Sequence, residues 1–203
     1  YTPQFDKVTD YLEGKTVETY LKQIAPRDGW FVREYAIQRK FFTKQNAGLI
    51  QACIDTIWNW RQEGIIDENE YAFLIASLIQ SMDKVANTAG TYYAYLKDFY
   101  RKAKKSFNFE LLVPIQGNKF CQVKLEDAEL LVSEVVCDIL YLDPPYNERN
   151  YQRYYHLPET IAEGKEPKPQ GKSGVYVAEE KHSAYNKEKS AMEAFERLIK
   201  SAN

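Results

Sequence analysis

Histidine and cysteine are scarce in this sequence, with two and three copies among 203 residues. The cysteines, Cys53, Cys121 and Cys137, lie far apart, which argues against a disulfide framework and favours buried thiols in a reducing compartment, the cytoplasm. With only His156 and His182 beside them, these thiols cannot build a conventional zinc site.

Long hydrophobic runs and a strong net charge are also absent. No apolar stretch is long enough to span a bilayer, and none resembles a signal peptide, so no membrane partner is expected. The net charge of −2 neither indicates nor excludes a nucleic-acid partner, because a local basic face is enough to bind phosphate. Apolar content of 44% and charged content of 28% are typical of a globular protein.

The sequence does contain helical periodicity in its middle part. Thr43 is suited to cap a helix whose apolar residues recur at spacings of three and four, and Gly64 is suited to end it. Asp67 and Glu70 have the spacing of a capping box at the start of a second helix. The pattern predicts an antiparallel helix pair, whereas residues 1–42 mix turn formers with aromatics and are expected to be irregular.

Tyrosine and lysine are mixed in residues 86–105, ANTAGTYYAYLKDFYRKAKK. The first half, around Gly90, is expected to loop, and the second half to be helical with a cationic end. Such an end suits the negative helix dipole, which is the simpler interpretation. The functional alternative is an edge that contacts phosphates and offers aromatic platforms. Composition alone favours the simpler one.

The pattern changes after residue 108. The expected elements are strands at 109–117 and 119–125, a helix at 126–135, a buried strand at 138–143, a mobile loop at 163–173 and an amphipathic helix at 187–203. A strand–helix–strand rhythm predicts α/β architecture with a parallel sheet.

The predicted buried strand ends in Asp143-Pro144-Pro145-Tyr146, and open α/β sheets bind ligands at the carboxyl ends of their strands. The two prolines hold the Asp143 side chain and the Pro144 carbonyl in a rigid relationship. Both groups accept hydrogen bonds, so together they are complementary to an NH₂ group, and Tyr146 adds a flat face. This predicts a slot for a planar ring whose exocyclic amine attacks an electrophile. An ordinary strand-ending turn is the alternative.

From about Phe41 onward, the sequence resembles the D12 class of adenine-specific DNA N6-methyltransferases. The resemblance is carried by the motif with its flanks, YLDPPYNERNYQRYYHLPETIA, and by the earlier segment NTAGTY. The resemblance implies a Rossmann-like fold, S-adenosylmethionine as cofactor and a flipped adenine in double-stranded DNA as target, in a restriction–modification or related system. It also implies that residues 1–105 are a mainly helical target-recognition insertion and that residues 106–203 belong to the catalytic α/β domain.

The resemblance assigns roles to the motif residues. Asp143 and the Pro144 carbonyl accept hydrogen bonds from the adenine amine, Pro145 stiffens the turn, and Tyr146 stacks on the base. Residues implied to lie near the base or the DNA are Asn87, Thr88, Tyr92, Asn147, Arg149, Tyr151 and Arg153. His156 is interpreted as structural, because this chemistry needs no imidazole. Candidates for reading base edges in the major groove are Arg27, Arg33, Arg39 and Lys40.

The sequence departs from the family in two ways. No glycine-rich cofactor turn of the type Asp/Phe-x-Gly-x-Gly occurs, and Tyr93 stands where a glycine is common. The chain is therefore expected to be an internal fragment and a poor methyltransferase by itself. Two other functions stay open: methylation of RNA or of cytosine N4, and a non-catalytic DNA-binding fragment.

Overall fold

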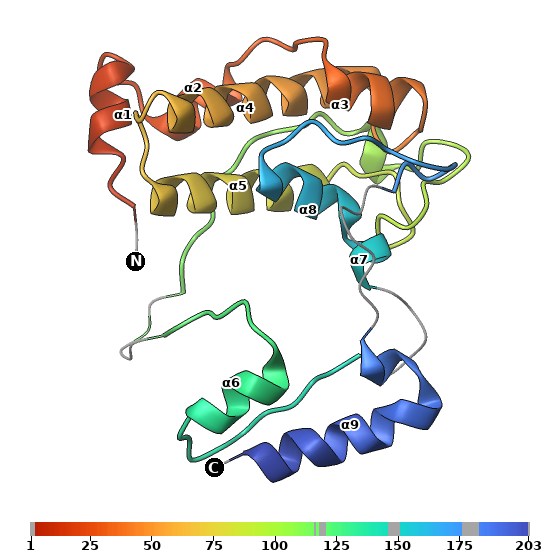
Figure 1. The fold of residues 1–203 in the computed structure, drawn as a ribbon. Helices are drawn as coiled ribbons and strands as arrows, with labels where there is room; N and C mark the ends of the chain where they lie inside the picture. Colours follow the sequence, from red (N-terminus) through yellow and green to blue (C-terminus); the bar gives the residue numbers. More distant parts are fainter. Residues whose placement is uncertain (1–2, 116, 118–120, 146–150, 176–182, 203) are drawn as a thin grey trace. The chain divides into compact units, whose positions relative to one another are not determined.

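A computed structural model of the chain describes residues 3–115, 117, 121–145, 151–175 and 183–202. The chain forms two compact units (Figure 1). The first, the helical unit, comprises Tyr1–Ile115 with Arg153–Val177, and the second unit comprises Gln116–Gln152 with Ala178–Asn203. The predicted division at residue 105 concerns the roles of the two parts and stays a prediction. No helix in the described parts of the chain has both the length and the apolar character that crossing a bilayer requires.

Short helical elements precede residue 40, where the sequence predicted irregular structure. They are α1 (Asp6–Tyr11), α2 (Val17–Lys22), α3 (Trp30–Val32) and the π-helical turn η1 (Arg33–Ile37). Thr16 caps α2, because its side-chain oxygen accepts a hydrogen bond from the Thr19 N–H at 3.3 Å. The prediction was wrong because helices of one or two turns depend on tertiary burial of their apolar face, which local patterns do not reveal.

The predicted helix pair is confirmed. α4 (Lys44–Gln62) begins after Thr43, whose side-chain oxygen accepts a hydrogen bond from the N–H three residues on, at 3.2 Å. Gly64, beyond its end, has φ of +65°, which glycine adopts without a Cβ clash. α5 (Glu68–Asp83) begins with the predicted reciprocal capping box and packs against α4.

The chain from residue 86 to residue 105, all of which the structure describes, runs mostly as a loop. The helix predicted for its second half is wrong, since only the 3-10 turn η2 (Lys102–Lys104) forms there. Asn87 supplies the reason: its side-chain N–H groups donate to the carbonyls of Lys40 and Leu96, at 2.8 and 3.0 Å. Its Oδ1 accepts the Tyr100 N–H at 3.0 Å. One amide thus ties residues 96 and 100 of the loop to residue 40 and satisfies backbone groups that a helix would pair internally.

Two helices follow the predicted motif, α7 (Tyr151–Tyr154) and α8 (His156–Glu163). α8 packs against α5, as Figure 1 shows, and buries Leu157 and Ile161 completely in the core of the helical unit. Gly164 ends α8 at φ +68°, where a Cβ atom would lie 3.0 Å from the Tyr71 hydroxyl. α8 therefore belongs to the same core as residues 1–115.

The second unit contains α6 (Ala128–Glu134), the 3-10 turn η3 (Ala184–Asn186) and α9 (Glu188–Ser201). Both helices predicted for this region are confirmed, and they pack against each other. Arg197 donates two hydrogen bonds to the Glu129 carboxylate, at 3.2 and 3.0 Å. The small core of these helices includes Val132, Ala194 and Leu198. Burial was predicted for all three cysteines; it is confirmed for Cys53 and is wrong for Cys121 and Cys137, which are exposed in this unit.

Strands are absent from the residues that the structure describes, which contain only two isolated bridges, Thr88 with Tyr95 and Gln170 with Val175. The strands predicted at 109–117, 119–125 and 138–143 are therefore not formed wherever those segments are described. Residues 116 and 118–120 lie outside the described residues.

The predicted buried strand at 138–143 is instead irregular and largely exposed, with Ile139 at 86% and Tyr141 at 84% of full exposure. A strand forms only where a neighbouring strand pairs its N–H and C=O groups, and the described residues supply no such neighbour here. The parallel sheet of the expected α/β fold is thus not confirmed by the structure of this chain.

Candidate active site

The Asp143-Pro144-Pro145 part of the predicted motif lies in the second unit. The Asp143 side chain is exposed and both prolines are half-buried. Among the described residues, none donates a hydrogen bond to the Asp143 carboxylate, which therefore remains available as an acceptor for a ligand. Tyr146, Asn147 and Arg149, the other predicted residues of this segment, lie outside the described residues.

The remaining predicted residues are divided between the two units. Tyr151 and Arg153 both lie on α7 with exposed side chains, the first in the second unit and the second in the helical unit. Asn87 and Tyr92 lie in the helical unit with Thr88. The structure thus places three predicted DNA-binding residues of the NTAGTY segment in one unit.

Asn87 and Thr88 are buried rather than presented to a ligand. Asn87 has no exposed surface, and its amide is engaged through both N–H groups and the oxygen in the loop contacts given above. Thr88 is 8% exposed, and its hydroxyl has no hydrogen-bond partner among the described residues. Asn87 therefore shapes the loop that carries the neighbouring tyrosines.

Tyr92 joins this loop to the segment that follows the motif. Its backbone N–H donates to the Tyr154 carbonyl at 3.0 Å, and its hydroxyl donates to Asp83 Oδ1 at 3.2 Å. Burial raises the pKa of the Tyr92 phenol well above its usual range, and the Asp83 carboxylate raises it further. With 5% of its surface exposed, the Tyr92 ring serves as an internal anchor in this structure.

His156 closes the same junction. Its Nε2 lies 2.9 Å from the Tyr92 carbonyl oxygen, which only accepts, so Nε2 carries the proton of the neutral ring. Burial lowers the pKa of His156 to about 4, against the effect of that hydrogen bond. Nδ1 has no partner among the described residues. The geometry agrees with the structural role predicted for this histidine, which stays neutral near pH 7.

Sequence reasoning missed a tyrosine pair at the edge of this junction. The rings of Tyr93 and Tyr154 stack with centroids 5.2 Å apart and planes inclined by 17°. Tyr93 is 46% exposed, so the pair presents aromatic surface to the outside of the helical unit. The high tyrosine content of both segments was the available signal, but their pairing depends on the fold. Exposed aromatic faces are suited to stacking on nucleobases.

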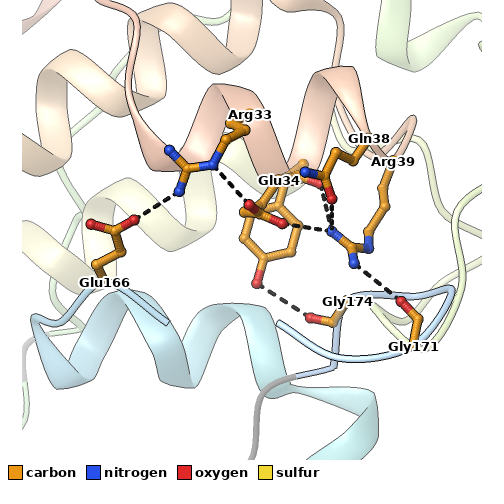
Figure 2. A network of polar contacts seen from close by, with 8 residues as sticks. Arg33, Glu34, Gln38, Arg39, Glu166, Gly171 and Gly174 are labelled. Atoms are coloured by element: carbon orange, nitrogen blue, oxygen red, sulfur yellow. Dashed lines mark hydrogen bonds and ion pairs between the residues drawn. The ribbon is translucent and has the colours of Figure 1, made fainter. Parts of the chain in front are cut away.

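Two of the four predicted readers of base edges form ion pairs with carboxylates of the protein, the buried Arg39 and the exposed Arg33 (Figure 2). Arg39 is 8% exposed, and its Nη1 donates to the Glu34 carboxylate at 2.9 Å. Arg33 donates to Glu34 at 2.9 Å and to Glu166 at 2.7 Å. These contacts leave Arg39 no access to a base edge in this structure and pair Arg33 with carboxylates.

The other two predicted readers are exposed. Arg27 lines an open hollow of about 290 Å³ beside the start of α4. The remaining lining residues of this hollow are Pro26, Asp28, Lys44, Gln45 and Gly48. Lys40, the other exposed reader, donates a hydrogen bond to the Lys97 carbonyl at 3.1 Å.

The chain is similar to a known family of proteins. A family model described as D12 class N6 adenine-specific DNA methyltransferase matches residues 15–203. No solved structure matches the chain.

Curated relatives include three bacterial proteins with long matches. The Type II methyltransferase M.NlaIII of Neisseria lactamica is 37% identical over 90% of this chain and 55% of its own length. The Type II methyltransferase M.FokI of Planomicrobium okeanokoites is 40% identical over 82% of this chain and 26% of its own length. The modification methylase LlaI of Lactococcus lactis subsp. lactis is 35% identical over 99% of this chain and 33% of its own length. The chain therefore spans about half the length of these relatives, or less.

Proposed function

The chain belongs to the D12 class of N6 adenine-specific DNA methyltransferases, and from this premise we propose that the whole protein methylates the N6 amine of adenine in double-stranded DNA. The observation that carries the proposal is the family match over residues 15–203, which includes the whole Asp-Pro-Pro-Tyr motif. The relatives' names, Type II methyltransferase and modification methylase, support a place in a restriction–modification system.

In the proposed reaction the adenine N6 atom forms a bond to a methyl carbon and gives up one proton. S-adenosylmethionine, when bound, would supply the methyl group by cleavage of its sulfonium–methyl bond and would leave as the neutral thioether S-adenosylhomocysteine. Asp143 and the Pro144 carbonyl each accept a hydrogen bond from the amine, which favours the tetrahedral nitrogen of the transition state. The exposed Asp143 carboxylate supports this role, because no described hydrogen bond must break before the amine binds. The released proton passes to Asp143 and then to solvent.

The target base leaves the duplex in this proposal, because its amine is inaccessible within the stacked helix. Tyr146 stacks on the flipped base, at roughly 1–3 kcal/mol by analogy with single-strand binding. Asn147 and Arg149 contact the base or its backbone, together with Tyr151 and Arg153. These assignments follow the family resemblance of the motif and its flank.

The glycine-rich cofactor turn of the family does not occur in this sequence. None of its nine glycines lies in an Asp/Phe-x-Gly-x-Gly turn. No residue of the chain is therefore assigned to the methyl donor.

We extend the proposal to the fold: residues 138–143 form a strand of a Rossmann-like sheet in the whole protein. Three apolar side chains of this region are more than four-fifths exposed in the present structure, Val136, Ile139 and Tyr141. A segment whose exposed apolar side chains are β-branched or aromatic is suited to pairing with further strands.

The test uses the full-length protein, tritiated S-adenosylmethionine and unmethylated duplex DNA, followed by digestion to nucleosides. We expect label in N6-methyladenine, and loss of that label in Asp143→Ala. Asp138→Ala is the matched control, because Asp138 is an exposed aspartate of the same segment outside the motif. Label in N4-methylcytosine, label in RNA alone, or no label from the wild-type protein would each contradict the proposal.

A further inference from the structure

Residues 164–174, here called the strap, follow α8 and lie against η1 and the turn after it (Figure 2). The sequence predicted a mobile loop here, but the structure anchors the segment at three points. Arg33, Arg39 and Tyr35 donate hydrogen bonds to it, at 2.7, 3.1 and 3.4 Å. The acceptors are, in the same order, Glu166 Oε1, the Gly171 carbonyl and the Gly174 carbonyl.

The central anchor is a buried ion pair. Arg39 and Glu34 are each 8% exposed, and Arg39 Nη1 donates to the Glu34 carboxylate at 2.9 Å and to the Glu34 carbonyl at 3.2 Å. Burying two charges is costly unless their remaining donors and acceptors are satisfied. The strap contributes to that requirement, because Arg39 Nη2 donates to the Gly171 carbonyl. Arg39 thus couples the strap to the buried part of the helical unit.

Gly174 fits the strap closely against this arginine. Its φ is +67°, and a Cβ atom at this position would lie 2.5 Å from Arg39 Nε. Both the backbone conformation and the close approach require glycine. The path of the strap is therefore set by the packing of its backbone on Arg39.

The anchored strap presents three lysines. Lys165, Lys168 and Lys172 are exposed, and none pairs with a carboxylate among the described residues. The carboxylate of Glu166, between the first two, is paired with Arg33. The strap therefore carries three exposed cationic side chains without an ion pair among the described residues.

A second lysine-bearing segment is fixed to the same turn. Lys40, next to Arg39, donates to the Lys97 carbonyl at 3.1 Å and accepts the Asn87 side chain on its own carbonyl at 2.8 Å. Lys97 is itself exposed. Residues 39 and 40 thus contact the backbone of two lysine-bearing segments, the strap at Gly171 and the loop at Lys97.

We propose that the strap is a DNA-backbone contact, in which Lys165, Lys168 and Lys172 bind phosphates and Arg39 is the positioning residue that holds them. The inference rests on the proposed function, in which duplex DNA is the negatively charged binding partner. Phosphate contacts fix the orientation of a protein on the duplex without reading sequence. An anchored loop loses less conformational freedom on binding than a free one, so its lysines contribute more to affinity.

The test measures the dissociation constant of the full-length protein for one duplex over a series of salt concentrations. Each phosphate contact contributes about 0.9 to the slope of log K against log salt, so Lys165→Ala, Lys168→Ala and Lys172→Ala together should lower the slope by roughly 2 to 3. The control removes the same charge elsewhere in the helical unit, at lysines of α1, α2 and the turn between them: Lys7, Lys15 and Lys22.

An unchanged slope in the strap variant, or an equal fall in the control, would overturn the inference. Loss of RNA binding without loss of duplex binding would overturn it too. These outcomes differ from failure of the proposed function, which is read from N6-methyladenine formed by the wild-type protein.

The positioning role of Arg39 has a separate test. Gly174→Ala keeps every strap lysine but forces the strap off Arg39, so the slope should fall by about 1 or more. Circular dichroism establishes that this variant is folded. A folded Gly174→Ala protein with the wild-type slope would show that Arg39 does not position the lysines.

Discussion

The helical unit and the second unit place their apolar side chains differently. In the helical unit, aromatic residues from distant parts of the sequence are fully buried together: Phe31, Tyr35, Phe41, Phe42 and Phe109. In the second unit, Val136, Ile139 and Tyr141 expose 84% or more of their surface. Burial of apolar surface stabilises a fold by about 25 cal/mol per Å². The helical unit, with the larger buried core, therefore gains more stabilisation from burial than the second unit.

This difference shows what each unit needs in order to form. Helices satisfy their backbone groups internally, so α4 and α5 need only apolar faces to pack against. Residues 138–143 need neighbouring strands as well as packing. The second unit therefore carries the proposed catalytic motif on a segment whose regular structure, in our proposal, depends on further strands.

The largest effect is expected from Asp143, which separates activity from stability. Asp143→Ala should lower the methylation rate by roughly 10³-fold, because one of two acceptors for the amine is lost. The unfolding midpoint in urea should stay within experimental error, since the side chain is exposed. A large fall in stability would show that Asp143 has a structural role and would break the contrast between the two units.

A pair of isoleucines tests the contrast directly. Ile54 is fully buried and Ile139 is 86% exposed. Ile54→Ala should cost about 2–5 kcal/mol in the free energy of unfolding. Ile139→Ala should cost less than about 0.5 kcal/mol in the 203-residue chain.

The same pair sharpens the proposal about the sheet. If residues 138–143 pair with further strands in the full-length protein, Ile139→Ala should there become costly, by roughly 2 kcal/mol or more. Urea denaturation of the full-length protein provides the measurement. An equally small cost in both chains would argue against a buried strand.

His156 gives the helical unit a pH dependence. Its pKa is about 4 in the folded protein and about 6.5 in an unfolded chain, so the unfolded state binds more protons between these values. The contribution of His156 to the free energy of unfolding is complete above about pH 6.5 and is lost as the pH falls toward 4. It amounts in total to something on the order of 3 kcal/mol. Urea midpoints measured from pH 7 to pH 4 test this, and His156→Gln should remove that part of the dependence.

The smallest effects are expected at the helix caps. Asp67 caps α5 in the helical unit, and Asp127 caps α6 in the second unit. Asp67→Ala should lower the stability of the helical unit by about 1 kcal/mol. Asp127→Ala should leave that stability unchanged and act only on α6, which amide hydrogen exchange can follow separately. Equal effects on both units would show that they unfold together.

The sequence by itself determined the features that depend on near neighbours. Thr43, Gly64 and the capping box at Asp67 mark the ends of α4 and α5, because caps act within one turn of the chain. The periodicity of apolar residues likewise predicted α6 and α9. The Asp-Pro-Pro-Tyr motif with its flanks was enough to indicate the family, because its chemistry is carried by consecutive residues.

Only the tertiary structure decided the features that join distant segments. Asn87 was predicted to bind DNA, yet its amide fixes a loop through residues at positions 40, 96 and 100. The strap depends on Arg39, more than 130 residues away in sequence. Such contacts, and the absence of paired strands in the described residues, follow from which groups find partners in space, and no local pattern records that.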